Sequence, residues 1–167
     1  MKMPRVAIVM GSDSDFDVME EGVKVLRDFA VSFEVHVMSA HRCPSVVSKF
    51  AAQASRRGIQ VIIAGAGGAA HLAGVVAAHT SLPVIGVPLA ATPLAGFDAL
   101  LATVQMPPGI PVATVAIGKF GAKNAAILAL QIMALADSGL RKKLDQFKAD
   151  MAKQVAVKNK ALQKKLR

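Results

Sequence analysis

The residues of this sequence best suited to chemistry are His41 and Arg42, which are adjacent in the segment Ser39-Ala-His-Arg-Cys-Pro. An imidazole can transfer a proton near neutral pH, and a guanidinium can bind a phosphate or a carboxylate through paired hydrogen bonds. A lone histidine is more often structural. This pair, however, follows an apolar stretch typical of a strand, Phe33–Met38, and short loops at strand ends commonly carry function. We therefore predict that both residues belong to a functional site.

A second polar segment, Gly11-Ser-Asp-Ser-Asp, follows the apolar run Val6–Met10. Its serines and aspartates favour the start of a helix, and the apolar residues from Phe16 onward recur with helical spacing. The free N–H groups and hydroxyls at such a helix start suit a phosphate. Asp13 and Asp15 would repel a phosphate unless they face elsewhere, and a ribose hydroxyl is the natural partner of such an aspartate.

A third candidate is a glycine-rich stretch within residues 58–97, which contain no Asp, Glu, Lys or Arg. The run Gly65-Ala-Gly-Gly-Ala-Ala fits the loose dinucleotide-binding pattern, but it follows a third strand and precedes any acidic residue by many positions. Its glycines are instead expected to let a planar or very small ligand approach the backbone. His71 is the polar side chain beside this expected hollow.

Other chemistry is less well supported. His36 falls inside a predicted strand and His79 near a helix end, so both are interpreted as structural. Cys43 is adjacent to His41, and neighbouring residues rarely align as thiol and base. The four histidines and single cysteine lack metal-ligand spacing, and the phosphate-binding motif of P-loop nucleotidases is absent. The residues alone therefore predict an α/β enzyme or binding module for a small phosphorylated metabolite, with no cofactor and no metal.

Short apolar segments alternate with helical patterns along the chain, which predicts a doubly wound parallel sheet with its loops gathered at one edge. The expected strands are Val6–Met10, Phe33–Met38, Val61–Ala64, Val84–Val87 and Val112–Ile117. Helices are expected after residue 15, from Pro44, near His71, around Ala95–Thr103 and over Asn124–Ala136. The carboxyl ends of parallel strands meet at one edge, so the three candidate segments are expected to lie together.

The composition predicts one domain, 1–167, with a core of 1–136 and a C-terminal amphipathic helix in 137–167. One cysteine and the lack of a signal peptide favour the cytoplasm. Residues 141–167 hold ten Lys or Arg and two Asp, a net charge of +8 out of +9 for the chain. A solvated helix that docks its apolar stripe is favoured over binding to nucleic acid or membrane, since charge runs are usually solvated.

Six segments together resemble one family, the catalytic subunit of phosphoribosylaminoimidazole carboxylase, which includes the bacterial N5-carboxyaminoimidazole ribonucleotide mutases of purine synthesis. The resemblance covers about residues 5–136. Its segments are Gly11-Ser-Asp-Ser-Asp, Ser39-Ala-His-Arg-Cys-Pro, Ala64-Gly-Ala-Gly-Gly-Ala-Ala-His-Leu-Ala-Gly, Leu82-Pro-Val-Ile-Gly-Val-Pro, Gln105-Met-Pro-Pro-Gly-Ile-Pro-Val and Asn124-Ala-Ala.

The resemblance implies a flavodoxin-like three-layer subunit in a homo-octamer, and a small-molecule ribonucleotide substrate whose carboxyl group moves from the exocyclic nitrogen to carbon 4 without ATP, metal or biotin. His41 would be the general acid and base. Ser12, Ser39 and Arg42 would bind the 5′-phosphate, and Asp15 the ribose. The remaining substrate-binding residues would be Gly67, Gly68, Ala70, His71 and Leu72.

Two rival functions stay open. A related branch of the family carboxylates aminoimidazole ribonucleotide with free carbon dioxide, but there a Lys follows the motif histidine, whereas Arg42 and the sequence Ala70-His-Leu-Ala-Gly here resemble the mutase branch. The other rival is a non-catalytic nucleotide-binding module with a basic interaction tail. Asp13 and Cys43 depart from the family pattern; we expect Asp13 to alter substrate affinity and Cys43 to have no chemical consequence.

Overall fold

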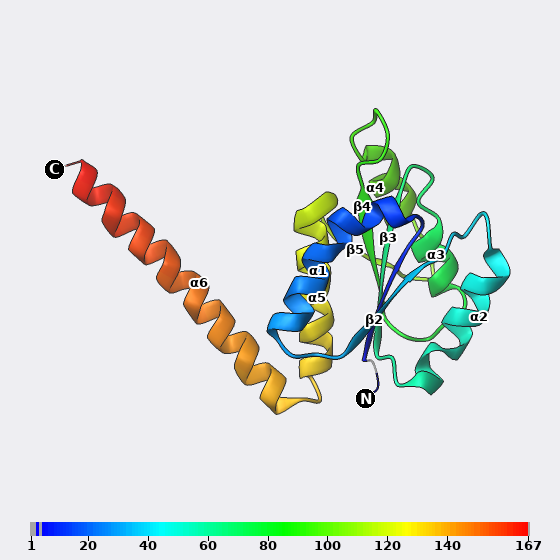
Figure 1. Ribbon diagram of the computed structural model, residues 1–167, viewed down its shortest axis with the longest axis horizontal. Coiled ribbons are helices and arrows are strands. Elements are labelled where there is room, and N and C mark those ends of the chain that lie inside the picture. The colour runs from blue at the N-terminus through cyan, green and yellow to red at the C-terminus, as the bar shows by residue number, and fades with distance from the viewer. Residues whose placement is uncertain (1–2, 4, 167) are drawn as a thin grey trace. The chain divides into compact units, whose positions relative to one another are not determined.

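The computed structural model describes residue 3 and residues 5–166. Its centre is a parallel sheet of five strands in the order β2-β1-β3-β4-β5 (Figure 1). This is the strand order of flavodoxin-like proteins, so the predicted fold class is confirmed. The strands are β1 (Val6–Met10), β2 (Phe33–Val37), β3 (Val61–Gly67), β4 (Val84–Leu89) and β5 (Ala113–Thr114).

Helices cover both faces of this sheet, as its apolar central strands require (Figure 1). All residues of β1 and β4 are buried, because helices pack on either side of them. Pro44 begins the second helix at its first turn, as predicted, and the four predicted apolar residues of that helix are buried. The helices are α1 (Phe16–Asp28), α2 (Pro44–Ala54), α3 (Leu72–Ala77), α4 (Phe97–Val104), α5 (Gly118–Ala134) and α6 (Ser138–Lys165).

The third strand is longer than predicted. The sequence predicts that this strand ends at Ala64, yet β3 continues to Gly67, and the chain first turns at Gly68, where φ is +60°. Gly65 pairs with Met10 on β1 in the parallel register. A Cβ on Gly65 would lie 2.5 Å from the Met19 sulfur, so the glycine permits close packing of α1 rather than a turn.

The bounds of three other elements also differ from the prediction. β4 continues past Val87 to Leu89 because it pairs with the extended end of β3. β5 is an edge strand of two residues, shorter than the predicted Val112–Ile117. α5 begins at Gly118 rather than Asn124, and its additional first turns include Lys123, which forms a 3.0 Å ion pair with Glu21 of α1.

The chain divides into two compact units, Met1–Ala129 and Leu130–Arg167. The division falls within α5, whereas the sequence places the junction between core and extension after residue 136. Within the second unit, the Asp137 carboxylate accepts a hydrogen bond from the Leu140 N–H and caps α6. This helix is amphipathic, as predicted. Within the described residues, none of the helices is both long and apolar enough to cross a lipid bilayer.

Candidate functional site

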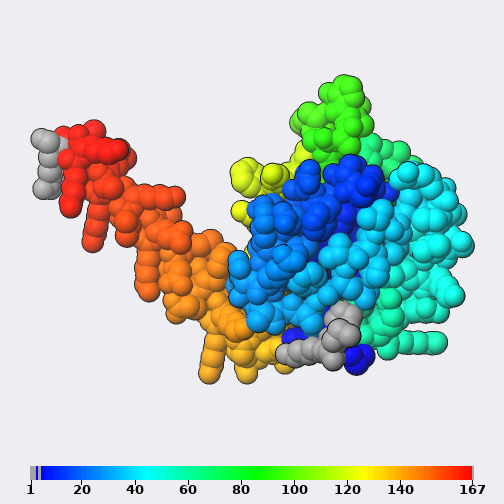
Figure 2. Space-filling model, in the orientation of Figure 1, coloured from blue at the N-terminus to red at the C-terminus, as the bar shows by residue number. Residues whose placement is uncertain are grey.

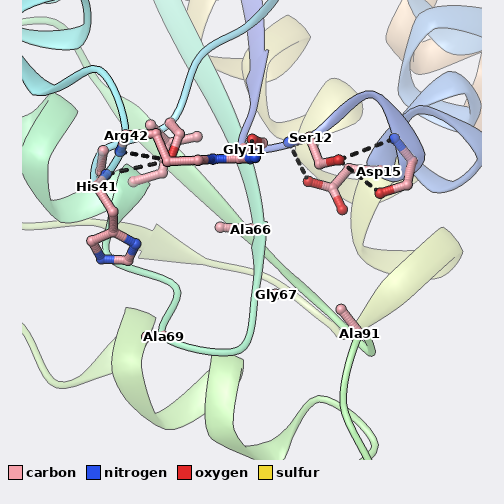
Figure 3. Close-up of a pocket in the computed structure, with 13 residues that line it drawn as sticks. Gly11, Ser12, Asp15, His41, Arg42, Ala66, Gly67, Ala69 and Ala91 are labelled. Atoms are coloured by element: carbon pink, nitrogen blue, oxygen red, sulfur yellow. Dashed lines mark hydrogen bonds between the residues drawn. The ribbon is translucent and has the colours of Figure 1, made fainter.

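A hollow of ≈ 390 Å³ opens where the carboxyl ends of β1, β2 and β3 meet (Figure 3). Figure 2 shows that the blue, cyan and green segments, which carry its lining, adjoin one another on the surface of the first unit. The strand order β2-β1-β3 makes these ends neighbours, which is where open α/β sheets bind ligands. Each of the three candidate segments contributes to it, so the sequence predicted their grouping. The lining residues are Gly11, Ser12, Ser14, Asp15, Ser39, Ala40, His41, Arg42, Ala66, Gly67, Ala69, Leu72 and Ala91.

The turn after β1 forms a capping box. The Asp15 carboxylate accepts a 3.0 Å hydrogen bond from the Ser12 N–H, while the Ser12 hydroxyl oxygen accepts from the Ser14 N–H at 3.4 Å and from the Ser14 hydroxyl at 2.9 Å. The Ser12 hydroxyl in turn donates to Asp13 at 3.1 Å. To donate to a phosphate, the Ser12 hydroxyl must therefore give up its hydrogen bond to the Asp13 carboxylate.

Burial raises the pKa of Asp15 above its ordinary value, and the charge of Asp13 adds to the shift. The N–H groups of Ser12 and Gly11 and the charge of Arg42 lower it and only partly offset the burial. The folded state therefore holds the Asp15 proton more tightly than the unfolded chain does. The stability that this group contributes is present below the unfolded pKa and is lost as pH rises through the folded pKa.

Asp15→Asn is consequently expected to leave the protein as stable as the wild type, or more stable, at pH 7. The Asn oxygen can still accept from the Ser12 N–H, and the desolvated charge is gone. Thermal melts at pH 7 and below pH ~4 would show the relative gain shrinking in acid. A variant that is less stable than the wild type at pH 7, with the difference vanishing in acid, would contradict this sign.

The loop after β2 brings Ser39, His41 and Arg42 to the opposite wall. The Ser39 hydroxyl oxygen accepts hydrogen bonds from the backbone N–H groups of His41 and Arg42, at 3.3 and 3.2 Å. The Arg42 guanidinium donates to the Gly11 carbonyl at 2.8 Å, which ties the β2 loop to the β1 loop (Figure 3). Because this bond occupies one of five guanidinium N–H groups, Arg42 retains donors for an anion.

The glycine-rich segment forms the floor. Gly67 lies so close to the loop after β4 that a Cβ there would be 2.5 Å from the Ala91 Cβ. Of the residues expected here, Gly67 and Leu72 line the hollow. Gly68, Ala70 and His71 are outside its lining: Gly68 forms the turn, and Ala70 is buried.

His71 nevertheless reaches the site through a second histidine. His41 Nε2 and His71 Nδ1 are 2.8 Å apart, with the rings edge to face. When both rings are neutral, one nitrogen must donate and the other accept, so the pair fixes one tautomer relative to the other. The arrangement places an imidazole that can transfer protons, a guanidinium that can bind an anion and an uncharged floor within one hollow.

The family described as AIR carboxylase matches residues 5–154. The chain belongs to this family. The resemblance inferred from the six sequence segments is thereby confirmed, and the family's extent beyond residue 136 shows that much of α6 lies within it.

Two relatives of this chain carry the same name. The N5-carboxyaminoimidazole ribonucleotide mutase of Pyrococcus abyssi is 58% identical over 89% of this chain and 84% of its own length. That of Saccharolobus solfataricus is 54% identical over 92% and 96%. The crystal structure of Treponema denticola PurE superimposes with a TM-score of 0.84 at 28% identity, covering 95% of this chain and 98% of that one.

Sequence reasoning did not single out Ser14, Ala69 or Ala91 as residues of the hollow. Ser14 was recognisable as part of the helix start, but its hydroxyl contact with Ser12 depends on the turn geometry. Ala91 carries no chemical signal and reaches the floor only because β4 pairs with β3. Within the described part of the chain, no group of three or more His, Cys, Asp or Glu is arranged to hold a metal ion.

Proposed function

We propose that this chain is an N5-carboxyaminoimidazole ribonucleotide mutase, an isomerase of de novo purine (IMP) biosynthesis. The supporting observation is the hollow itself, in which His41 lies beside Arg42 on one wall and above a glycine floor without charged residues. Its product is 4-carboxy-5-aminoimidazole ribonucleotide. The relatives' shared name supports the same activity.

Different lining residues of the hollow bind the phosphate, the ribose and the aminoimidazole of the substrate. Arg42 and the hydroxyls of Ser12 and Ser39 bind the 5′-phosphate, since a cation and O–H donors line the hollow together beside the helical turn after β1. Asp15 accepts from the ribose hydroxyls. The aminoimidazole lies against the segment from Gly67 to Leu72, where Gly67 allows a flat ring to approach closely. Within this segment Gly67 and Leu72 line the hollow, whereas Gly68, Ala70 and His71 lie outside its lining.

The reaction needs one proton to be given to the substrate and one proton to be removed from it. As the bond between the exocyclic nitrogen and the carboxyl carbon breaks, His41 gives a proton to that nitrogen and carbon dioxide is released. Carbon 4 of the ring then attacks carbon dioxide, and His41 removes the proton that carbon 4 carried. His41 ends as it began, so no cofactor is consumed. His71, hydrogen-bonded to His41, holds the ring orientation for both transfers.

The carbon dioxide must stay beside the ring between the two steps. Proximity rather than activation limits such a recombination, so a small enclosed pocket is the main requirement. Ala66, Gly67, Ala69 and Ala91 provide walls with no side-chain group that could compete as a nucleophile.

The deciding experiment is a carboxyl-transfer assay on purified protein without added ATP or metal. One sample receives N5-carboxyaminoimidazole ribonucleotide at low bicarbonate, and the other receives aminoimidazole ribonucleotide at high bicarbonate. Efficient conversion of the first alone supports the mutase. Conversion of the second alone supports the direct carboxylase, and conversion of neither leaves a nucleotide-binding module.

The carboxylase alternative has one observation in its favour. A phosphoribosylaminoimidazole carboxylase from Saccharomyces cerevisiae is 52% identical over 98% of this chain, although this chain spans 28% of that protein. The paired assay separates the two reactions because only the mutase begins from the N-carboxylated substrate.

The chain is further proposed to act in the cytoplasm as a single 167-residue domain within a homo-octamer, without nucleic-acid or membrane partners. α6 supports self-association because apolar side chains recur along one of its sides and are exposed within its unit. Val155 and Leu162, seven residues apart on that side, are 67% and 54% exposed. A second copy of the chain would cover them.

Val155→Lys combined with Leu162→Lys is therefore expected to lower the oligomer mass. If a second copy covers this apolar side of α6, each lysine would bury an unpaired charge in the contact. Light scattering after size-exclusion chromatography measures it. Lys153→Gln with Lys160→Gln, at the same spacing on the opposite side of α6, is the matched control and should retain the wild-type mass. An unchanged mass for the first pair would place the contact elsewhere.

A further inference from the structure

Cys43 occupies the N-cap of α2 but does not cap that helix, because no backbone N–H of α2 bonds to its thiol. The thiol instead points back to Ser39. The Ser39 N–H donates to Cys43 Sγ at 3.2 Å, and the thiol donates to the Ser39 carbonyl at 3.3 Å. The same carbonyl accepts from the Cys43 N–H at 3.0 Å. The backbone of Ser39 is thus held on both its polar groups by one residue.

Packing in the protein core holds the Cys43 side chain in place. Cys43 packs against the hydrophobic cluster under the sheet that contains Met38 and Val47, both buried. The thiol therefore links the packed core to the loop that carries Ser39. A loop fixed in this way keeps its side chains in place before a ligand arrives, which reduces the ordering cost of binding.

The position of the Ser39 backbone sets the direction of the Ser39 hydroxyl. Its oxygen already accepts two backbone hydrogen bonds, from His41 and Arg42. A hydroxyl has two acceptor positions and one donor, so the O–H is the group that remains for a ligand. Its direction depends on where the Ser39 backbone is held, and hence on Cys43.

We propose that Cys43 is a positioning residue for the phosphate subsite, acting through its thiol hydrogen bonds to Ser39. This inference rests on the proposed function, in which Ser39 binds the 5′-phosphate. It replaces the expectation that a cysteine at this position has no chemical consequence. Cys43 affects how tightly the anion is bound, whereas the proton transfers at His41 proceed as before.

Cys43→Ala removes both thiol contacts and is expected to raise KM, and the Ki of inorganic phosphate as a competitive inhibitor, about fivefold. The kcat should stay within about twofold, since no catalytic group is touched. Cys43→Ser restores a small donor and acceptor and should return both constants toward the wild-type values. Ser48→Ala, which removes an exposed hydroxyl of α2 bonded to the Ser45 carbonyl, is the control and should change neither.

A second measurement avoids any folding defect of the variant. The chain has a single cysteine, so iodoacetamide on the folded wild-type protein modifies one thiol. Circular dichroism confirms that the fold is kept, and the modified protein should show the same rise in KM and phosphate Ki. Unchanged constants after modification or in Cys43→Ala, or a Ser variant as impaired as the Ala variant, would overturn the proposal. Failure of the proposed function would differ, because the unmodified wild type would then not convert N5-carboxyaminoimidazole ribonucleotide.

Discussion

His41→Asn is expected to lower kcat by about 10²- to 10⁴-fold, with little change in KM. Asparagine stays polar, but its amide reaches only to about the position of Nδ1, so the 2.8 Å contact between His41 Nε2 and His71 is lost as well. It cannot take up and return a proton at neutral pH, so both the protonation of the exocyclic nitrogen and the deprotonation of carbon 4 lose their catalyst. Single-turnover and steady-state rates with N5-carboxyaminoimidazole ribonucleotide measure the effect.

His36→Asn provides the matched control for this substitution. His36 lies in β2, with its Nε2 3.3 Å from a Glu34 carboxylate oxygen, and it does not line the hollow. Its replacement should leave kcat near the wild-type value. If His41→Asn binds substrate normally and retains wild-type turnover, the acid–base role belongs to another group, and His71 is the first to test.

Arg42→Lys is expected to raise KM roughly 10- to 100-fold while kcat changes much less. The positive charge remains, but the planar fork that can bind two phosphate oxygens at once is lost. Lysine also lacks the geometry that lets Arg42 bond to the Gly11 carbonyl at 2.8 Å and still present further N–H groups. Substrate titrations and the Ki of inorganic phosphate report the change.

Arg57→Lys is the corresponding control, because it makes the same substitution at a residue outside the hollow. Arg57 forms a 2.8 Å ion pair with Glu34 and lies over the Phe50 ring. Its replacement should leave KM unaltered. An unchanged KM in Arg42→Lys would remove Arg42 from the phosphate subsite and leave the two serines as the candidates.

Much of the fold followed from local patterns. The apolar run Val6–Met10 is β1 with the predicted bounds, and Pro44 starts α2, because strand burial and the geometry of proline act within a few residues. The predicted end of β3, at Ala64, was wrong. Gly65 and Gly67 are turn formers in isolation, yet pairing with β1 and β4 keeps them extended. Tertiary pairing overrides local preference there.

The sequence by itself determined which side chains each loop carries: hydroxyls and carboxylates after β1, the His41–Arg42 pair after β2, and small residues after β3. It also determined the family, since six segments in order are specific. The tertiary structure decided how they meet. His41 and His71 are 30 residues apart, and their 2.8 Å contact exists because β2 and β3 flank β1. The hydrogen bonds of Ser12 to Asp13 and of Cys43 to Ser39 likewise depend on side-chain directions. Residue types are local information, whereas such contacts depend on strand order, register and rotamers that only the folded chain fixes.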